Sequence, residues 1–224
     1  KARDGREHEI RPCIGTSMGC VAQLMTTGRL QCVVNVAAGK ERSVEFETPA
    51  PALVRKKVLV IGGGPAGLEA ARTAALRGHD VHLYEMKNHL GGQVRIAASA
   101  PHRADLEAIT RFLADEITRL GVHVHLRTPV DPDLVIEQHP DDLIVATAST
   151  PRRGGFQLSS PSTPVPGGDL AHVYTVWDVL GFGGRAPAIM AAFANGSMAH
   201  CLDFDDHAPE GHHYSSSIVP AAFA

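Results

Sequence analysis

The chain has 224 residues, a formal net charge of −3 and an apolar content of 44%, which are ordinary values for a folded domain in water. At that charge no bulk positive field attracts nucleic acid or an anionic membrane, so neither is an expected partner. No run of about 18 apolar residues predicts a membrane span, and the polar segment Lys1 to Arg11 does not resemble a secretory signal. The cytoplasm is therefore the expected compartment.

Three zones differ in composition. Residues 1–53 are rich in Gly, Thr and Cys and predict loops around short strands, whereas residues 54–182 alternate strand and helix signals. Residues 183–224 are rich in Ala, His and Asp and predict helix, loop, helix. The fold class is therefore α/β: a Rossmann-like parallel sheet that binds FAD or NAD(P), with an N-terminal cysteine loop and a short α-helical C-terminal segment. The abrupt start and end suggest a piece of a longer protein.

The N-terminal zone holds three of the four cysteines. Cys13, Cys20 and Cys32 lie close together in the sequence, and Cys201 is far from them. In a cytosolic chain such a cluster favours metal binding over disulfides.

The middle zone begins with a short apolar run, Lys57 to Ile61, that suits a buried parallel strand. A helix over 64–77 and a strand over 80–85 are predicted to follow. An amphipathic helix over 103–120 comes next, then a strand over 122–126 with one face exposed to water. The apolar run 142–147 predicts another buried strand.

The loop Gly62-Gly-Gly64-Pro-Ala-Gly67 joins the first strand to the first helix, and Glu85 ends the next strand. This context is typical of a dinucleotide-binding fingerprint. Gly62 permits a tight turn, Gly64 lets the backbone approach a pyrophosphate, and Gly67 allows close packing. The helix N-terminus attracts phosphates, while Glu85 can accept hydrogen bonds from ribose hydroxyls and would repel a 2′-phosphate. The alternative is a glycine-rich turn without a ligand.

Three downstream segments are informative: Leu90-Gly-Gly-Gln93, Val130 after Arg127-Thr-Pro, and a strand leading into Ala146-Thr147-Ala148. They resemble the NADH:flavin oxidoreductase family, which includes 2,4-dienoyl-CoA reductase and trimethylamine dehydrogenase. The family has Gly where this chain has Ala148, and the extra methyl group is expected to weaken binding. The resemblance implies FAD, or ADP alone, as cofactor. Together with the glycine loop, it predicts these nucleotide contacts: Gly62, Gly64, Pro65, Ala66, Gly67, Glu85, Gly92, Gln93, Val130, Thr147 and Ala148.

The same family carries an iron–sulfur loop before its dinucleotide domain. Cys13, Cys20 and Cys32 match three of its four cysteine ligands, and Thr16 occupies the position of the remaining one. Clusters need soft thiolate ligands, for which a neutral hydroxyl is a poor substitute. Three outcomes are open: no cluster, a three-iron cluster, or a labile 4Fe–4S cluster with an outside ligand.

The C-terminal zone contains the stretch Ala-His200-Cys-Leu-Asp203-Phe-Asp-Asp. On this stretch, residues 185–224 resemble a fragment of the MmgE/PrpD family, the 2-methylcitrate dehydratase-like lyases. It implies Asp203, His207 and His213 as catalytic residues for proton abstraction beside a carboxylate. Two alternatives are a divalent-metal site built from the same histidines and aspartates, and a solvated loop without a role.

The resemblances leave three functional hypotheses. The chain could be the FAD-binding part of a flavin-dependent oxidoreductase, a fragment of a lyase, or a non-catalytic ADP-binding module. In intact members of the oxidoreductase family, electrons pass from NAD(P)H through FAD and the iron–sulfur cluster to FMN in a barrel. The expected partners are a small-molecule nucleotide and either a separate FMN barrel or a second copy of the chain.

Overall fold

The computed structural model describes residues 1–42, 49–100, 102–150, 160, 162–171, 173–175 and 177–178. The chain divides into two compact units. The first unit comprises Lys1–Ala98 with His102–Ala148, and the second comprises Ser99–Pro101 with Ser149–Ala224. In the second unit, the Asp178 carboxylate accepts hydrogen bonds from the amide and the hydroxyl of Thr175, both at 2.7 Å. The sheet and the glycine loop belong to the first unit.

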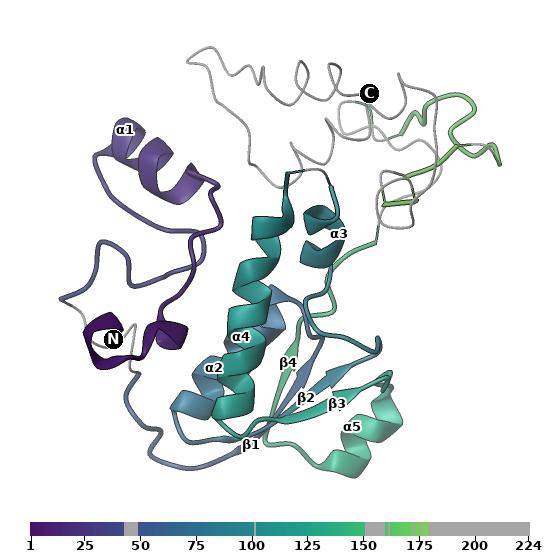
Figure 1. Ribbon diagram of the computed structural model, residues 1–224. Coiled ribbons are helices and arrows are strands. Elements are labelled where there is room, and N and C mark those ends of the chain that lie inside the picture. The colour runs from purple at the N-terminus through teal and green to yellow at the C-terminus, as the bar shows by residue number, and fades with distance from the viewer. Residues whose placement is uncertain are drawn as a thin grey trace. The chain divides into compact units, whose positions relative to one another are not determined.

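A four-stranded parallel sheet forms the centre of the first unit (Figure 1). Its strands are β1 (Lys57–Ile61), β2 (Asp80–Glu85), β3 (His123–Leu126) and β4 (Asp142–Val145), in the spatial order β3-β2-β1-β4. The chain moves outward from β1 to β3 and then returns to the other side of β1 for β4. This reversal creates a switch point at the carboxyl ends of β1 and β4, where open α/β sheets bind ligands. The predicted α/β fold is confirmed.

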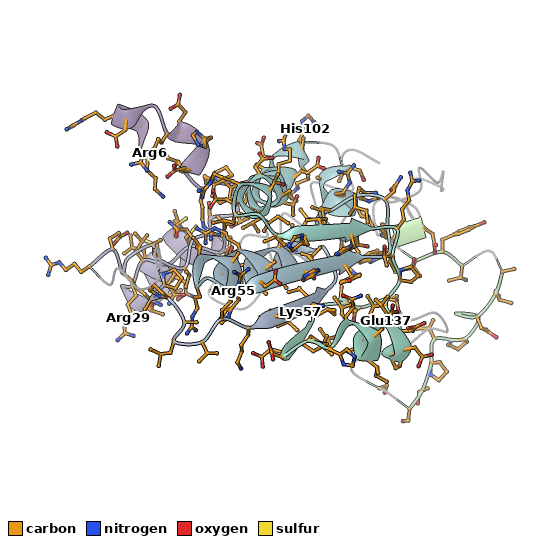
Figure 2. All side chains as sticks on the ribbon, turned by 90° about the horizontal axis from the view of Figure 1, so that it is seen from below. Arg6, Arg29, Arg55, Lys57, His102 and Glu137 are labelled. Carbon is orange, nitrogen blue, oxygen red and sulfur yellow. The ribbon has the colours of Figure 1, made fainter. Side chains whose placement is uncertain are left out.

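Helices α2 (Pro65–Leu76) and α4 (Ala108–Arg119) pack against each other and against one face of the sheet. The short helices α3 (Val94–Ala98) and η5 (Ala104–Glu107) precede α4, and α5 (Pro132–Gln138) lies on the side of the sheet opposite α4 (Figure 2). The core between sheet and helices consists of Val58, Val60, Leu68, Ala71, Val81, Leu83, Ile109, Phe112, Leu113, Ile117 and Val122. Burying one such large apolar side chain contributes about 1.5–3 kcal/mol.

Strand β4 corrects one prediction. It pairs with β1 as expected, but it ends at Val145 and is an edge strand among the described residues. The side chains of Leu143 and Val145 are 45% and 63% exposed, so the prediction of a buried strand is wrong. An apolar run indicates that a strand can be buried, but burial also requires a covering element. Helix α5 does not cover these side chains of β4. Its end lies near β1, because the Lys57 ammonium donates to the Gln138 carbonyl at 2.6 Å; Lys57 is labelled in Figure 2.

The N-terminal segment is built from short helical turns. They are η1 (Ala2–Asp4), η2 (Glu7–Glu9), the π-helical turn η3 (Met18–Ala22) and α1 (Gln23–Thr27). Residues 1–42 and 49–53 contain no strand, so the predicted short strands are wrong for this described part. Several backbone hydrogen bonds of these turns are local, such as those from the Gly5 amide to the Ala2 carbonyl at 3.1 Å and from the Ile10 amide to the Glu7 carbonyl at 2.9 Å.

Arg11 attaches the N-terminal segment to the helices. Its guanidinium donates to the Val34 carbonyl at 2.8 Å and pairs with Glu69 of α2 at 2.6 Å. The same group lies 5.5 Å from the centre of the Phe112 ring of α4, within the range of a cation–π contact. The cysteine loop therefore packs against α2 and α4.

The predicted helix-loop-helix over 183–224 lies outside the described residues, together with Asp203, His207 and His213. In the described part of the chain, no helix combines the length and the apolar character needed to cross a bilayer.

Candidate functional site

The glycine loop makes a tight turn between β1 and α2. Gly62 has φ 110°, which glycine adopts without strain, and its amide donates to the Tyr84 carbonyl of β2 at 2.8 Å. A side chain at Gly62 would collide with the carbonyl oxygen of Ala146, and one at Gly67 would collide with the Gly62 carbonyl. Protein atoms therefore enclose these two glycines, which hold α2 close to the ends of β1 and β4.

Gly64 differs from these two glycines because its surroundings are open. It is the N-cap of α2, and a Cβ built there would meet only the Gly92 Cα, at 3.9 Å. No side chain caps the helix, and its first hydrogen bond runs from the Leu68 amide to the Gly64 carbonyl at 2.9 Å. The amides of Ala66 and Gly67 come before Leu68 in the chain, so they are among the first amides of the helix, which have no intrahelical acceptor. An anion would find both hydrogen-bond donors and a partial positive charge here.

Glu85 ends β2 beside this loop and is only 7% exposed. Its Oε2 accepts a hydrogen bond from the Gly63 amide, and its Oε1 accepts one from the Lys87 amide, each at 2.8 Å. A carboxylate has about four acceptor positions, so ribose hydroxyls could still bind. The carboxylate thus has a structural role that sequence reasoning missed: it joins the glycine loop to the segment that follows β2.

The segment after β2 forms the opposite wall. The Gly91 amide donates to the Gly63 carbonyl at 2.8 Å, and a Cβ at Gly92 would lie 2.9 Å from the Gly64 Cα. Leu90 closes the space beside Gly63, where a Cβ would meet its Cδ2 atom at 2.6 Å. Gly63, Leu90 and Gly91 were not among the predicted site residues. The clustering of glycines in both segments was the signal that could have identified them.

Val130 and the end of β4 complete the site. The amides of Arg127 and Thr128 donate to the carbonyls of Lys87 and Glu85 at 2.8 and 3.0 Å, which holds the segment leading to the half-buried Val130 beside the end of β2. Thr147 and Ala148 are exposed and follow β4. Because the four strands are parallel, the predicted nucleotide contacts all lie toward their carboxyl ends. Whether they bind a nucleotide stays a prediction.

Ala148 adopts φ 62°, a left-handed conformation that favours glycine. We expect Ala148→Gly to raise the free energy of unfolding by about 0.5–1 kcal/mol, because relief of roughly 1–2 kcal/mol of strain exceeds the added flexibility of the unfolded chain. Urea unfolding followed by circular dichroism measures the change. The same substitution at Ala114 within α4 should instead destabilise by about 1 kcal/mol. A destabilised Ala148→Gly variant would refute the strain argument.

The three cysteines of the N-terminal segment are free thiols. Cys13 is exposed, and Cys20 and Cys32 are half-buried. The segments of the last two touch, because a Cβ at Gly19 would lie 2.9 Å from the Cys32 Cα. Among the described residues, the three sulfurs do not meet as ligands of a single ion. Sulfur ligands around a multi-iron cluster lie farther apart, so the iron–sulfur site stays a prediction.

Replacing Thr16 with cysteine should restore a complete ligand set. After anaerobic reconstitution, we expect the Thr16→Cys variant to hold about four irons per chain, where the parent chain holds fewer, since each iron of a 4Fe–4S cluster takes one thiolate. Iron analysis and the visible absorbance bleached by reduction measure this gain. Thr27→Cys in α1 adds a thiol elsewhere and should change nothing. A Thr16→Cys variant that holds no iron after reconstitution would contradict a cluster at this loop.

The family can be decided by comparison with known proteins. A family model described as "NAD(P)-binding Rossmann-like domain" matches residues 60–123. NADH oxidase of Thermoanaerobacter brockii is 41% identical over 184 residues, which are 80% of this chain and 26% of that protein. Bilirubin reductase of Mediterraneibacter gnavus is 34% identical over 181 residues, again 80% of this chain and 26% of the relative. Over 80% of its length, this chain is similar to members of the NADH:flavin oxidoreductase family.

A similar solved structure confirms the fold. The 6-hydroxypseudooxynicotine amine oxidase of Pseudomonas geniculata N1 matches with a TM-score of 0.74 and 32% identity, covering 88% of this chain and 31% of that one. This chain spans about a quarter of the length of the curated relatives it matches. The predicted resemblance to the NADH:flavin oxidoreductase family is confirmed. None of these relatives supports the resemblance of residues 185–224 to the MmgE/PrpD family.

Proposed function

We propose that this chain is the FAD-binding, or ADP-binding, part of a flavin-dependent NAD(P)H oxidoreductase resembling 2,4-dienoyl-CoA reductase. When bound, FAD would supply the electron relay between NAD(P)H and an FMN barrel outside this chain. One observation carries the proposal: the start of α2 at Gly64 is open and uncapped, and the acidic Glu85 lies beside it. We place this activity in the cytoplasm, where free thiols such as Cys13, Cys20 and Cys32 persist.

The nucleotide would lie along the carboxyl edge of the sheet. Its pyrophosphate would accept hydrogen bonds from the amides of Ala66 and Gly67, because these donors begin α2 without an intrahelical partner. The backbones of Gly64 and Gly92 line this space without side chains and leave room for the phosphate oxygens. The ribose would bind Glu85, and the adenine would lie near Val130.

Glu85 also favours one class of nucleotide. Its carboxylate is nearly buried at 7% exposure, and a 2′-phosphate on the ribose would bring a second negative charge against it. Like charges at close range in a poorly solvated site cost several kcal/mol. FAD, ADP and NAD⁺ carry a free 2′-hydroxyl and fit this carboxylate, whereas NADP⁺ does not.

Nucleotide analysis of the purified full-length chain tests the proposal. Released ligand is identified by chromatography, and FAD, ADP, NAD⁺ and NADP⁺ are titrated by calorimetry. We expect FAD or ADP to bind most tightly and NADP⁺ most weakly. Bound flavin gives a yellow protein, which separates an electron-relay module from one that holds ADP alone.

Two results would overturn the proposal. The first is that no adenine nucleotide binds, which would make the loop a glycine-rich turn without a ligand. The second is that NADP⁺ binds most tightly, which would contradict the role of Glu85. A colourless protein that binds no nucleotide but dehydrates a hydroxy acid would favour the lyase hypothesis based on Asp203, His207 and His213.

A further inference from the structure

Three side chains of types that can bind metal ions meet near the start of β2 and β3, away from the glycine loop. Asp80 and His82 lie two residues apart on β2, so their side chains share one face of the strand. His123 of β3 is the direct cross-strand partner of His82. Val81 and Leu83 alternate with these residues and pack into the core, so the three polar side chains face away from α2 and α4.

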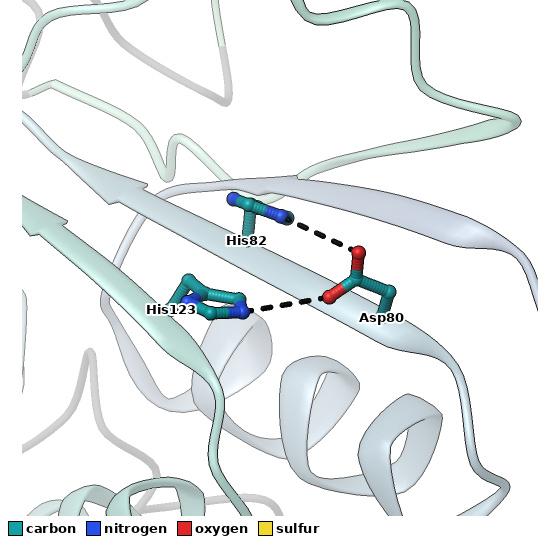
Figure 3. A group of neighbouring side chains, drawn as sticks. All are labelled: Asp80, His82 and His123. Atoms are coloured by element: carbon teal, nitrogen blue, oxygen red, sulfur yellow. Dashed lines mark ion pairs between the residues drawn. The ribbon is translucent and has the colours of Figure 1, made fainter.

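The two imidazoles converge on one carboxylate (Figure 3). The Nε2 atom of His82 lies 3.7 Å from Oδ2 of Asp80, and the Nε2 atom of His123 lies 3.5 Å from Oδ1. The ligand atoms of all three residues lie within 4.8 Å of one another. Ligand atoms around a tetrahedral zinc ion, with bonds of about 2.0–2.2 Å, are separated by roughly 3.3–3.5 Å. Small side-chain rotations would therefore bring all three within bonding distance of one ion.

A fourth residue orients the first imidazole. The other ring nitrogen of His82, Nδ1, lies 3.4 Å from Nε2 of His125. A proton on Nδ1, held by His125, would leave the Nε2 lone pair free for a metal. His125 is itself fixed by stacking on Tyr84, with ring centres 4.3 Å apart.

We propose that Asp80, His82 and His123 bind a divalent transition-metal ion of the Zn²⁺ class. Two imidazoles and one carboxylate make a site with an open fourth position for water. The ion would join β2 to β3 at the amino ends of the strands. The nucleotide site lies at their carboxyl ends, so the two sites are separate.

Two cations near the site oppose metal binding. The Arg55 guanidinium lies 4.0 Å from Oδ1 of Asp80, and its side chain is 73% exposed, so it can turn into solvent. Lys57 also acts on His82 electrostatically. The Arg55→Gln variant should therefore bind the ion more tightly than the parent chain. If Asp80 served only as the partner of Arg55, the substitution would not raise the affinity for the ion.

Titration of the full-length chain with Zn²⁺ alone tests the proposal. The titration uses a background in which Cys13, Cys20 and Cys32 are serines, because thiolates bind zinc themselves. Calorimetry should reveal one tight site, and Zn²⁺, unlike Mg²⁺, should raise the melting temperature. His123→Gln should weaken that site at least tenfold, and the side chain is 57% exposed, so the fold should tolerate the change. His8→Gln, in the exposed η2 turn, is the matched control.

The His125→Phe variant separates a metal site from a mere ion-pair cluster. Phenylalanine keeps the stacking on Tyr84 but removes the nitrogen that orients His82, so Zn²⁺ affinity should fall roughly 10–100-fold. If His123→Gln binds zinc as tightly as its background, the ligands are other residues, such as the C-terminal histidines. That result would overturn the proposal. The absence of any zinc-dependent rise in melting temperature would do the same. FAD binding by these variants is measured in parallel and should not change.

Discussion

Replacing Gly64 with valine is expected to remove most nucleotide binding while leaving the protein folded. Gly64 has φ −78° and ψ 179°, a conformation that valine adopts readily. Its added side chain would point into open space, since only the Gly92 Cα lies within 4 Å of a Cβ there. That space is where the pyrophosphate would approach the free amides of α2. Losing hydrogen bonds to a charged group costs about 3 kcal/mol, roughly a hundredfold in Kd.

Calorimetric titration with FAD and ADP measures the affinity, and thermal unfolding verifies the fold. Thr73→Val places a valine in the last turn of the same helix and should leave both values unchanged. Gly67→Ala provides the contrasting case, because its new methyl group would collide with the Gly62 carbonyl and should destabilise by about 1–3 kcal/mol. If Gly64→Val binds FAD as tightly as the parent chain, the nucleotide does not lie over the start of α2.

The second large effect is expected from Glu85→Gln, which should reduce both stability and nucleotide affinity. The two carboxylate oxygens of Glu85 accept the amides of Gly63 and Lys87, each at 2.8 Å. Glutamine keeps the shape but turns one acceptor into a donor, so one of these buried amides would face another N–H group. An unsatisfied buried donor costs about 1–3 kcal/mol, which lowers Tm by roughly 2–12 °C for a chain of this size.

Differential scanning calorimetry with and without FAD separates the two contributions of Glu85. Glu137→Gln, on the exposed side of α5, makes the same chemical change and should leave Tm within about 1 °C. A melting temperature unchanged by Glu85→Gln would show that the two hydrogen bonds contribute little. Unchanged discrimination against NADP⁺ would remove the electrostatic argument for a free 2′-hydroxyl.

Local signals were sufficient for the β1–α2–β2 unit. The strand boundaries at 57–61 and 80–85 agree with the structure, as does the amphipathic face of α4. The predicted helix over 64–77 is shorter by a residue at each end, because Gly64 and Arg77 act as caps. Such elements are predictable because apolar spacing and turn-forming glycines act over a few neighbouring residues. The glycine loop was recognisable for the same reason.

The amino-acid sequence by itself determined the succession of β1, α2, β2, α4, β3 and β4 along the chain, the glycine turn and the acidic residue that ends β2, since each depends on short-range pattern. Only the tertiary structure decided that β4 is exposed, that Ala148 is left-handed, and that Glu85 holds the Gly63 amide. It also decided that His123 lies opposite His82, because the register of β2 and β3 sets this pairing. Register and burial depend on which distant segments meet, and no local pattern contains that information.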